Sequence, residues 1–195
     1  MKIFRNLLVT FIFFIFGHNS VASNSVETEK KIDLNLYLGK WYEIAAIPQS
    51  FQKQCVKNTT AEYGLTDDDM IKVINSCDKN DGSRSVAEGR ARVVDKSTNS
   101  KLEVTFVKLF DWIFSFGGDY WILKVGENYE YSIVGHPNRK YAWILSRTPA
   151  LSLEQLERIN SVLENNGYDT CLLLMSPQEP GYNKRDKLCE YVNQE

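Results

Sequence analysis

Histidine is the scarcest of the residue types that commonly serve in catalysis. Only His18 and His136 occur among 195 residues, and His136 stands before a proline in a polar stretch typical of a solvated turn. The four cysteines never adopt a Cys-x-x-Cys spacing, which disfavours a zinc site or a dithiol redox centre. Because no nucleophile, base and orienting group can be assembled, we expect no enzymatic activity, no catalytic residue, no metal and no cofactor.

Long apolar runs and an excess of basic charge are also missing. The apolar run at 7–17 is too short for a membrane span, which needs roughly 20 residues. It lies between a basic start and Ser20-Val21-Ala22, so residues 1–22 are predicted to be a cleaved signal peptide. Removing it lowers the basic residues from 23 to 21 against 25 acidic ones, a net charge of −4. This balance argues against nucleic acid as a partner.

The cysteine count is even, and all four cysteines follow the predicted signal peptide: Cys55, Cys77, Cys171 and Cys189. This predicts two disulfides in an oxidising compartment, although four cysteines allow three pairings. No cysteine directly follows the apolar run, so a lipoprotein anchor is not expected. We therefore expect an exported protein with one domain of about 170 residues.

Short segments of β-forming residues, separated by turn signals, predict strands along most of the chain. The expected strands are 40–47, 59–65, 70–77, 84–94, 101–108, 120–125, 129–135 and 141–147. Residues 151–166 instead place apolar residues at helical spacing, with Ser152 and Gln155 as a capping box and Gly167 as the stop. A short apolar strand is expected at 171–175. The pattern predicts an all-β barrel with one late helix.

Loop lengths distinguish the two ends of this barrel. The turns that contain 67–69, 95–99 and 126–128 are tight and polar. The other links are 48–58, 78–83, 109–119 and 136–140. In an up-and-down barrel the two sets alternate, so the second set is predicted to surround an open mouth.

Two motifs carry a family resemblance. Gly39-Lys40-Trp41-Tyr42 begins the first strand, and Trp143-Ile144-Leu145-Ser146-Arg147 ends the eighth. In this order, with one late helix, they resemble the lipocalins, most closely the bacterial lipocalin and apolipoprotein D branch. The resemblance implies an eight-stranded up-and-down antiparallel β-barrel with one C-terminal α-helix packed outside. It also implies that Gly39, Trp41 and Arg147 are structural, with the guanidinium stacked on a tryptophan that plugs the closed end.

The resemblance spans residues 36–178, which would form the barrel and its helix. Residues 23–35 are then expected to be a flexible N-terminal segment, and residues 179–195 a C-terminal tail. Strand positions place Cys55 and Cys77 near each other at the mouth, which favours the pairs Cys55–Cys77 and Cys171–Cys189. Apolipoprotein D-like chains suggest the alternative Cys55–Cys189.

Because side chains alternate between the two faces of a strand, keeping charges outward assigns a cavity lining. The predicted ligand-binding residues are Tyr63, Val73, Asn75, Val104, Phe106, Trp121, Tyr131, Tyr141 and Trp143. Small inward residues in the fourth strand, Ala87, Gly89 and Ala91, favour a cavity over a filled core.

Aromatic residues alternate through the predicted mouth loop at 109–119: Phe110, Trp112, Phe114 and Phe116. Loops are normally polar, so this pattern indicates a ligand gate or a contact surface. The alternative is that the loop folds back over the barrel.

The resemblance implies a soluble carrier or store of a small hydrophobic or amphiphilic ligand, such as a fatty acid or lysophospholipid. The expected partners are that ligand and a membrane contacted transiently, for a monomer or weak dimer. The alternatives are an envelope interaction protein that uses the aromatic loop, or a haem or tetrapyrrole binder. The branch favours the periplasm of a Gram-negative bacterium, with secretion as the alternative.

Overall fold

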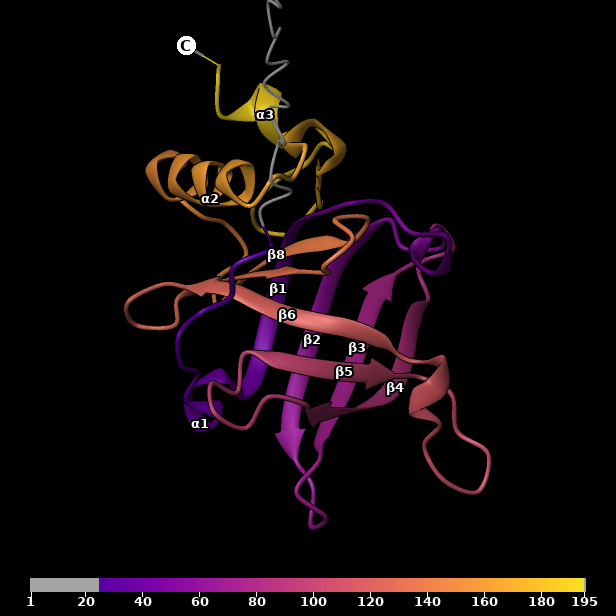
Figure 1. Ribbon diagram of the computed structural model, residues 1–195. Helices are drawn as coiled ribbons and strands as arrows, with labels where there is room; N and C mark the ends of the chain where they lie inside the picture. The colour runs from indigo at the N-terminus through magenta and orange to yellow at the C-terminus, as the bar shows by residue number, and fades with distance from the viewer. Residues whose placement is uncertain (1–24, 195) are drawn as a thin grey trace, which may run out of the picture.

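Eight antiparallel strands close into a barrel in the computed structural model, which describes residues 25–194 (Figure 1). Each strand pairs with the next, and β1 pairs with both β8 and β2. The strands are β1 (Gly39–Ala46), β2 (Lys57–Leu65), β3 (Ile71–Asp78), β4 (Arg84–Val93), β5 (Lys101–Thr105), β6 (Gly118–Val125), β7 (Tyr131–Gly135) and β8 (Ala142–Ser146). The predicted barrel is confirmed, and its strands begin and end within a few residues of the predicted positions.

Helix α2 (Leu153–Asn165) packs against the outside of the barrel, as predicted. The Ser152 side chain accepts a hydrogen bond from the Gln155 backbone, and the Gln155 side chain reaches back to the Ser152 N–H, so the predicted capping box forms. The helix buries one face, Leu156, Ile159 and Leu163, against the outer side of β7 and β8. No helix in residues 25–194 is long and apolar enough to cross a membrane.

Short elements complete the chain around the barrel. They are α1 (Leu34–Tyr37), the 3-10 turns η1 (Ser50–Gln52), η2 (Phe114–Phe116) and η3 (Thr170–Leu172), strand β9 (Leu174–Met175) and α3 (Leu188–Tyr191). The strand expected at 171–175 is therefore a 3-10 turn followed by two strand residues. Strand β9 adds to the edge of β1.

The segment before the barrel has more contacts than a flexible segment would. Ile32 is 1% exposed, and its N–H donates to the Thr98 carbonyl at 2.7 Å. Val26 is also buried, and the Glu29 N–H donates to the Ile122 carbonyl. The composition of this stretch is polar, but two apolar side chains dock it onto the barrel. The predicted signal peptide, residues 1–22, lies outside the described residues.

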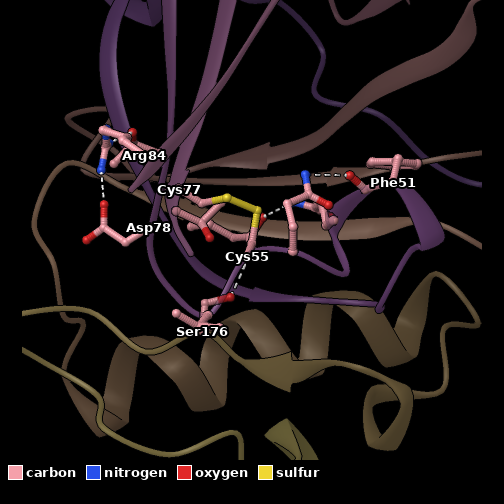
Figure 2. The surroundings of a disulfide bond; sticks show 12 residues. Phe51, Cys55, Cys77, Asp78, Arg84 and Ser176 are labelled. Atoms are coloured by element: carbon pink, nitrogen blue, oxygen red, sulfur yellow. Dashed lines mark hydrogen bonds and ion pairs between the residues drawn. A yellow bond between two sulfur atoms is a disulfide. The ribbon is translucent and has the colours of Figure 1, made fainter. Parts of the chain in front are cut away.

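Both favoured disulfides are present, and Cys55–Cys189 does not form. The Cα atoms are 5.4 Å apart in Cys55–Cys77 and 4.9 Å apart in Cys171–Cys189. Figure 2 shows the first of these bonds joining the chain before β2 to the end of β3, beside the ion pair of Arg84 and Asp78. The second joins η3 to α3 and so ties the C-terminal tail down.

Residues 174–178, named the C-terminal wedge below, lie between β1 and β2 where these strands separate. Pairing of β1 with β2 covers only Gly39 to Tyr42, and β9 then becomes the partner of β1. On the other side, the Asn58 N–H donates to the Pro177 carbonyl at 2.8 Å. The wedge is therefore part of the barrel wall at this position.

Candidate functional site

The closed end of the barrel is sealed by Trp41. Its side chain is 0% exposed, and its Nε1 donates to the Tyr37 carbonyl at 2.8 Å. The Arg147 guanidinium lies 3.6 Å from the centre of the indole ring. It also donates to three backbone carbonyls at 2.7–2.9 Å, those of Leu36, Leu38 and Lys40. This guanidinium therefore ties α1 to β1 under the floor of the barrel.

Three tyrosines form the floor of the interior above this plug. The Tyr120 hydroxyl bonds to the hydroxyls of Tyr63 and Tyr37, at 2.9 and 2.8 Å, and Tyr37 continues to Ser132 at 2.9 Å. Burial raises the pKa of Tyr37 to about 12 and raises the pKa values of Tyr63 and Tyr120 as well. All three are therefore neutral phenols at physiological pH and can donate hydrogen bonds.

A small cavity of about 10 Å³ adjoins this floor, which is room for about one water molecule. Its lining is Leu34, Tyr37, Leu38, Tyr63, Ile71, Ala91, Leu102, Val104 and Tyr120. The deep half of the barrel is thus close to filled by its own side chains.

The half of the barrel nearer the mouth is more open. Ala61, Asn75 and Ala87 are aligned across β2, β3 and β4, on the face that also carries Tyr63 and Val73. Ala87 is exposed and Asn75 is half-buried, although both face inward. The Asn75 Oδ1 is buried and lacks a hydrogen-bond partner within the described chain. An inward residue that solvent reaches indicates a hollow connected to the outside.

The rim between β4 and β5 contributes to this opening. These strands pair only from Arg90 to Val93, so the mouth half of β4 has no neighbour in β5. Phe106 follows β5 and lies across Gly89, where an added Cβ would approach its ring to 2.8 Å. The same Cβ would lie 2.6 Å from the Thr105 carbonyl oxygen, so glycine is required there for the backbone and the ring to approach this closely. Phe106 remains 44% exposed.

Most predicted lining residues lie on the inner face. Tyr63 and Val73 are buried there, and Val104 lines the small cavity above the tyrosine floor. Trp143 is partly buried and packs against the interior cluster. Tyr141 stacks on Trp143 with ring centres 6.2 Å apart, toward the mouth.

Trp121 and Tyr131 were assigned to the wrong face. Trp121 pairs with Lys101, whose ammonium lies 4.4 Å from the ring centre, and Tyr131 packs into the cluster beneath α2. A bulge between Ile122 and Lys124 shifts the alternation in β6, so Lys124 could not predict the face of Trp121. Helix α2 covers the outer face of β7, so this face is apolar as well. An apolar residue in β7 therefore does not have to face the barrel interior.

The interior residues that the sequence did not reveal come from the same two strands and from α1. The inward-facing residues of these strands are Tyr120, Ile122, Ser132 and Val134. Tyr37 also faces the interior, but it ends α1 and so lies outside the predicted strands. The signal in β7 was the alternation of smaller residues, Ser132 and Val134, with larger ones, Tyr131 and Ile133.

The four aromatic residues of the mouth loop divide into two pairs. Trp112 and Phe114 fold back on the outer wall of β4, with guanidinium carbons over their rings at 4.8 and 4.4 Å, those of Arg90 and Arg92. The other pair, Phe110 and Phe116, is 96% and 71% exposed. The loop is therefore held to the barrel by one pair and presents the other to solvent.

His136 lies at the rim and is less solvated than its sequence predicted. Its side chain is 18% exposed, and its Nε2 lies 3.6 Å from an Asp119 carboxylate oxygen. Its Nδ1 accepts from the Asn138 N–H, and its ring lies 5.3 Å from that of Tyr141. The Nδ1 is thus engaged by a backbone N–H, whereas the Nε2 lies beyond hydrogen-bond distance of Asp119.

Comparison with known proteins agrees with this geometry. A family model described as a lipocalin-like domain matches residues 32–178. The chain belongs to the lipocalin family. Temperature-induced lipocalin-1 of Arabidopsis thaliana is 38% identical over 155 residues, which cover 78% of this chain and 83% of that protein. The bacterial and apolipoprotein D branch is confirmed by two further relatives.

Those relatives are outer membrane lipoprotein Blc of Vibrio cholerae and apolipoprotein D of Macaca fascicularis. They are 36% and 35% identical; each alignment covers 80% of this lipocalin, and 88% and 82% of the relative. Among solved structures, insecticyanin from the tobacco hornworm Manduca sexta matches with a TM-score of 0.63 and 26% identity, over 78% of this chain and 84% of that one. This match agrees with the closed barrel and its outer helix.

Proposed function

We propose that this lipocalin binds and carries or stores a small hydrophobic or amphiphilic molecule, such as a fatty acid or a lysophospholipid. The observation that carries this proposal is the contrast between the two halves of the barrel. Trp41 and Tyr63 seal the deep half, whereas Asn75 and Ala87 face inward and are still reached by solvent. The hollow near the mouth is the site for the ligand.

The chemistry of the walls favours an acyl chain. Val73, Val104, Phe106 and Trp143 offer apolar contact, and each methylene moved from water contributes about 0.8 kcal/mol. Micromolar affinity corresponds to about 8 kcal/mol, so a long acyl chain with ten or more buried methylenes reaches it without an ion pair. The unpartnered Asn75 oxygen adds one acceptor for a donor group on the ligand.

The exposed side of the mouth supports uptake from a membrane. Leu109, Phe110 and Phe116 are 73%, 96% and 71% exposed, and Phe51, in the loop between β1 and β2 at the same end of the barrel, is 59% exposed. Apolar side chains gathered at an entrance are typical of a contact surface. We infer a transient contact with a lipid surface, during which the ligand passes into the barrel.

A second candidate function rests on the same side chains. Phe110 and Phe116 would then bind a protein of the cell envelope, and the barrel would act as a scaffold. A haem or tetrapyrrole ligand has less support, because His136, the one histidine in residues 25–194, lies at the rim rather than inside the barrel.

The compartment is inferred from the disulfides. Two disulfides require an oxidising environment, and the Vibrio cholerae relative is named an outer membrane lipoprotein. We infer a place in a cell envelope, the periplasm in a Gram-negative bacterium, with secretion as the alternative.

The test uses one tryptophan on each face of the barrel. Trp143→Ala should weaken binding of a long-chain lysophospholipid, measured by titration of the delipidated protein. Trp121→Ala, on the outer face, is the matched control and should bind normally. Equal loss in both variants, or no loss in either, contradicts the cavity. Native mass spectrometry of protein purified from its own source would identify the bound molecule.

A further inference from the structure

The barrel wall has a seam at the mouth end, where the C-terminal wedge fills the gap between β1 and β2. The Ser176 N–H donates to the Ile44 carbonyl at 2.8 Å. The Gln178 side chain donates to the carbonyls of Glu43 and Thr59, both at 2.8 Å, so one amide spans the two strands. Side-chain and wedge hydrogen bonds thus replace the direct strand ladder that closes the rest of the barrel.

One carboxylate lies at this seam. Glu43 is opposite Leu145 in the pairing of β1 with β8, and Leu145 belongs to the interior cluster, so Glu43 faces inward. Its Oε1 accepts from the Ser176 hydroxyl at 2.6 Å, and its Oε2 accepts from the Gln52 amide at 2.9 Å. Gln52 ends η1 in the loop between β1 and β2, named the η1 loop below. The Glu43 side chain therefore ties the C-terminal wedge to the η1 loop.

The surroundings of Glu43 are almost uncharged. The side chain is buried, and within the described residues the charge that acts on it is Arg185, whose guanidinium donates to the Cys55 and Val56 carbonyls at 2.8 and 3.3 Å. The neighbouring β2 presents the neutral phenol of Tyr63. Glu43 thus has hydrogen-bond donors but no ion pair within 4.0 Å in residues 25–194.

Burial raises the pKa of Glu43, and the hydrogen bonds from Ser176 and Gln52, with the charge of Arg185, offset this only in part. A carboxyl with a raised pKa binds its proton more tightly in the closed seam than in an opened one. The closed seam is therefore most stable below the ordinary pKa of the group, and this stability is lost as pH rises through the raised value.

We propose that Glu43 is a latch. When neutral, its carboxyl donates to the Ser176 hydroxyl and accepts from the Gln52 amide, which fastens the wedge to the η1 loop across the seam. When ionised, it loosens the seam and speeds ligand exchange. The second half of this statement rests on the proposed function. The first half concerns the protein alone and is tested without a ligand.

The first experiment measures hydrogen exchange of the backbone amides of Ser176 and Asn58, which donate across the seam. Their protection factors should fall as pH rises from 5 through the raised pKa of Glu43, by at most about tenfold for each pH unit. Glu43→Gln should remove this fall. Glu62→Gln, an exposed glutamate on β2, is the matched control and should retain it. An unchanged fall in Glu43→Gln, or no fall in the natural protein, overturns the latch.

The second experiment follows release of a lysophosphatidylcholine with a fluorescent acyl chain, whose own charge is constant between pH 5 and pH 8. Release should be faster at pH 8 by the factor found for seam opening, and slow at both pH values in Glu43→Gln. Ser176→Ala should release quickly at both. If exchange protection follows the prediction but no amphiphile binds, the carrier function fails and the latch stands. If the ligand binds and Glu43→Gln releases it with the natural pH dependence, the latch fails and the carrier function stands.

Discussion

Replacing Trp41 by alanine tests how the closed end is built. The substitution removes a fully buried indole, its hydrogen bond to Tyr37 and the ring on which Arg147 stacks at 3.6 Å. Loss of a buried tryptophan costs about 3–5 kcal/mol, against a total stability of about 5–15 kcal/mol for a domain. For a chain of this size, each kcal/mol lowers the melting temperature by about 2–4 °C. We therefore expect a fall of roughly 6–20 °C.

The assay is thermal unfolding of the ligand-free protein followed by circular dichroism, supported by denaturant titration. Trp112→Ala is the control, because that ring lies outside the barrel under Arg90 and its loss should cost only about 1 kcal/mol. A Trp41→Ala protein that melts at the natural temperature would refute the plug. So would equal losses in both variants.

Two further predictions concern the mouth loop and the buried phenols. The double variant Phe110→Ser and Phe116→Ser should bind lipid vesicles less in a flotation assay, while its affinity for a dissolved ligand stays unchanged. Leu153→Ser, on the exposed side of α2, is the control and should change neither property. A loss of affinity for the dissolved ligand would show that the loop lines the site. Burial raises the pKa values of Tyr37 and Tyr63 above the ordinary value of 10, so the stability that they contribute is complete below pH 10. The contribution of Tyr37 is lost as pH rises through about 12, and that of Tyr63 at still higher pH. Ultraviolet titration should show them ionising only as the protein unfolds, and smooth ionisation near pH 10 in the folded protein would be inconsistent with the buried chain of hydroxyls.

The strand order, the helix and the disulfides could be predicted because each depends on a local signal. Turn residues separate the strands, and the Ser152 and Gln155 capping box marks the helix start. The Cys55–Cys77 bond follows from the register of the β2–β3 hairpin, because the pair Lys57 and Asp78 lies within two residues of both cysteines.

The faces of β6 and β7 could not be predicted, because they depend on a bulge and on a distant helix. The bulge beyond Ile122 changes which residues share a face, and α2 makes the outer side of Tyr131 apolar. Alternation identifies an inner face only where the outer face meets water.

The N-terminal segment and the mouth loop show a related limit. Val26 and Ile32 dock a polar stretch onto the barrel. Cation–π contacts from Arg90 and Arg92 hold Trp112 and Phe114, whereas Phe110 and Phe116 stay exposed. Such contacts join residues far apart in the sequence, so composition alone cannot reveal them.

The most direct test of the carrier function is a chain-length series bound to the delipidated protein. Lysophosphatidylcholines that differ only in acyl length keep the head group constant while changing the apolar surface that the cavity buries. Affinity should rise by about fourfold for each added methylene until the hollow above Tyr63 is filled, and then level off. Affinity that does not change with chain length, or no binding at any length, would contradict the carrier function and favour a partner protein at the mouth.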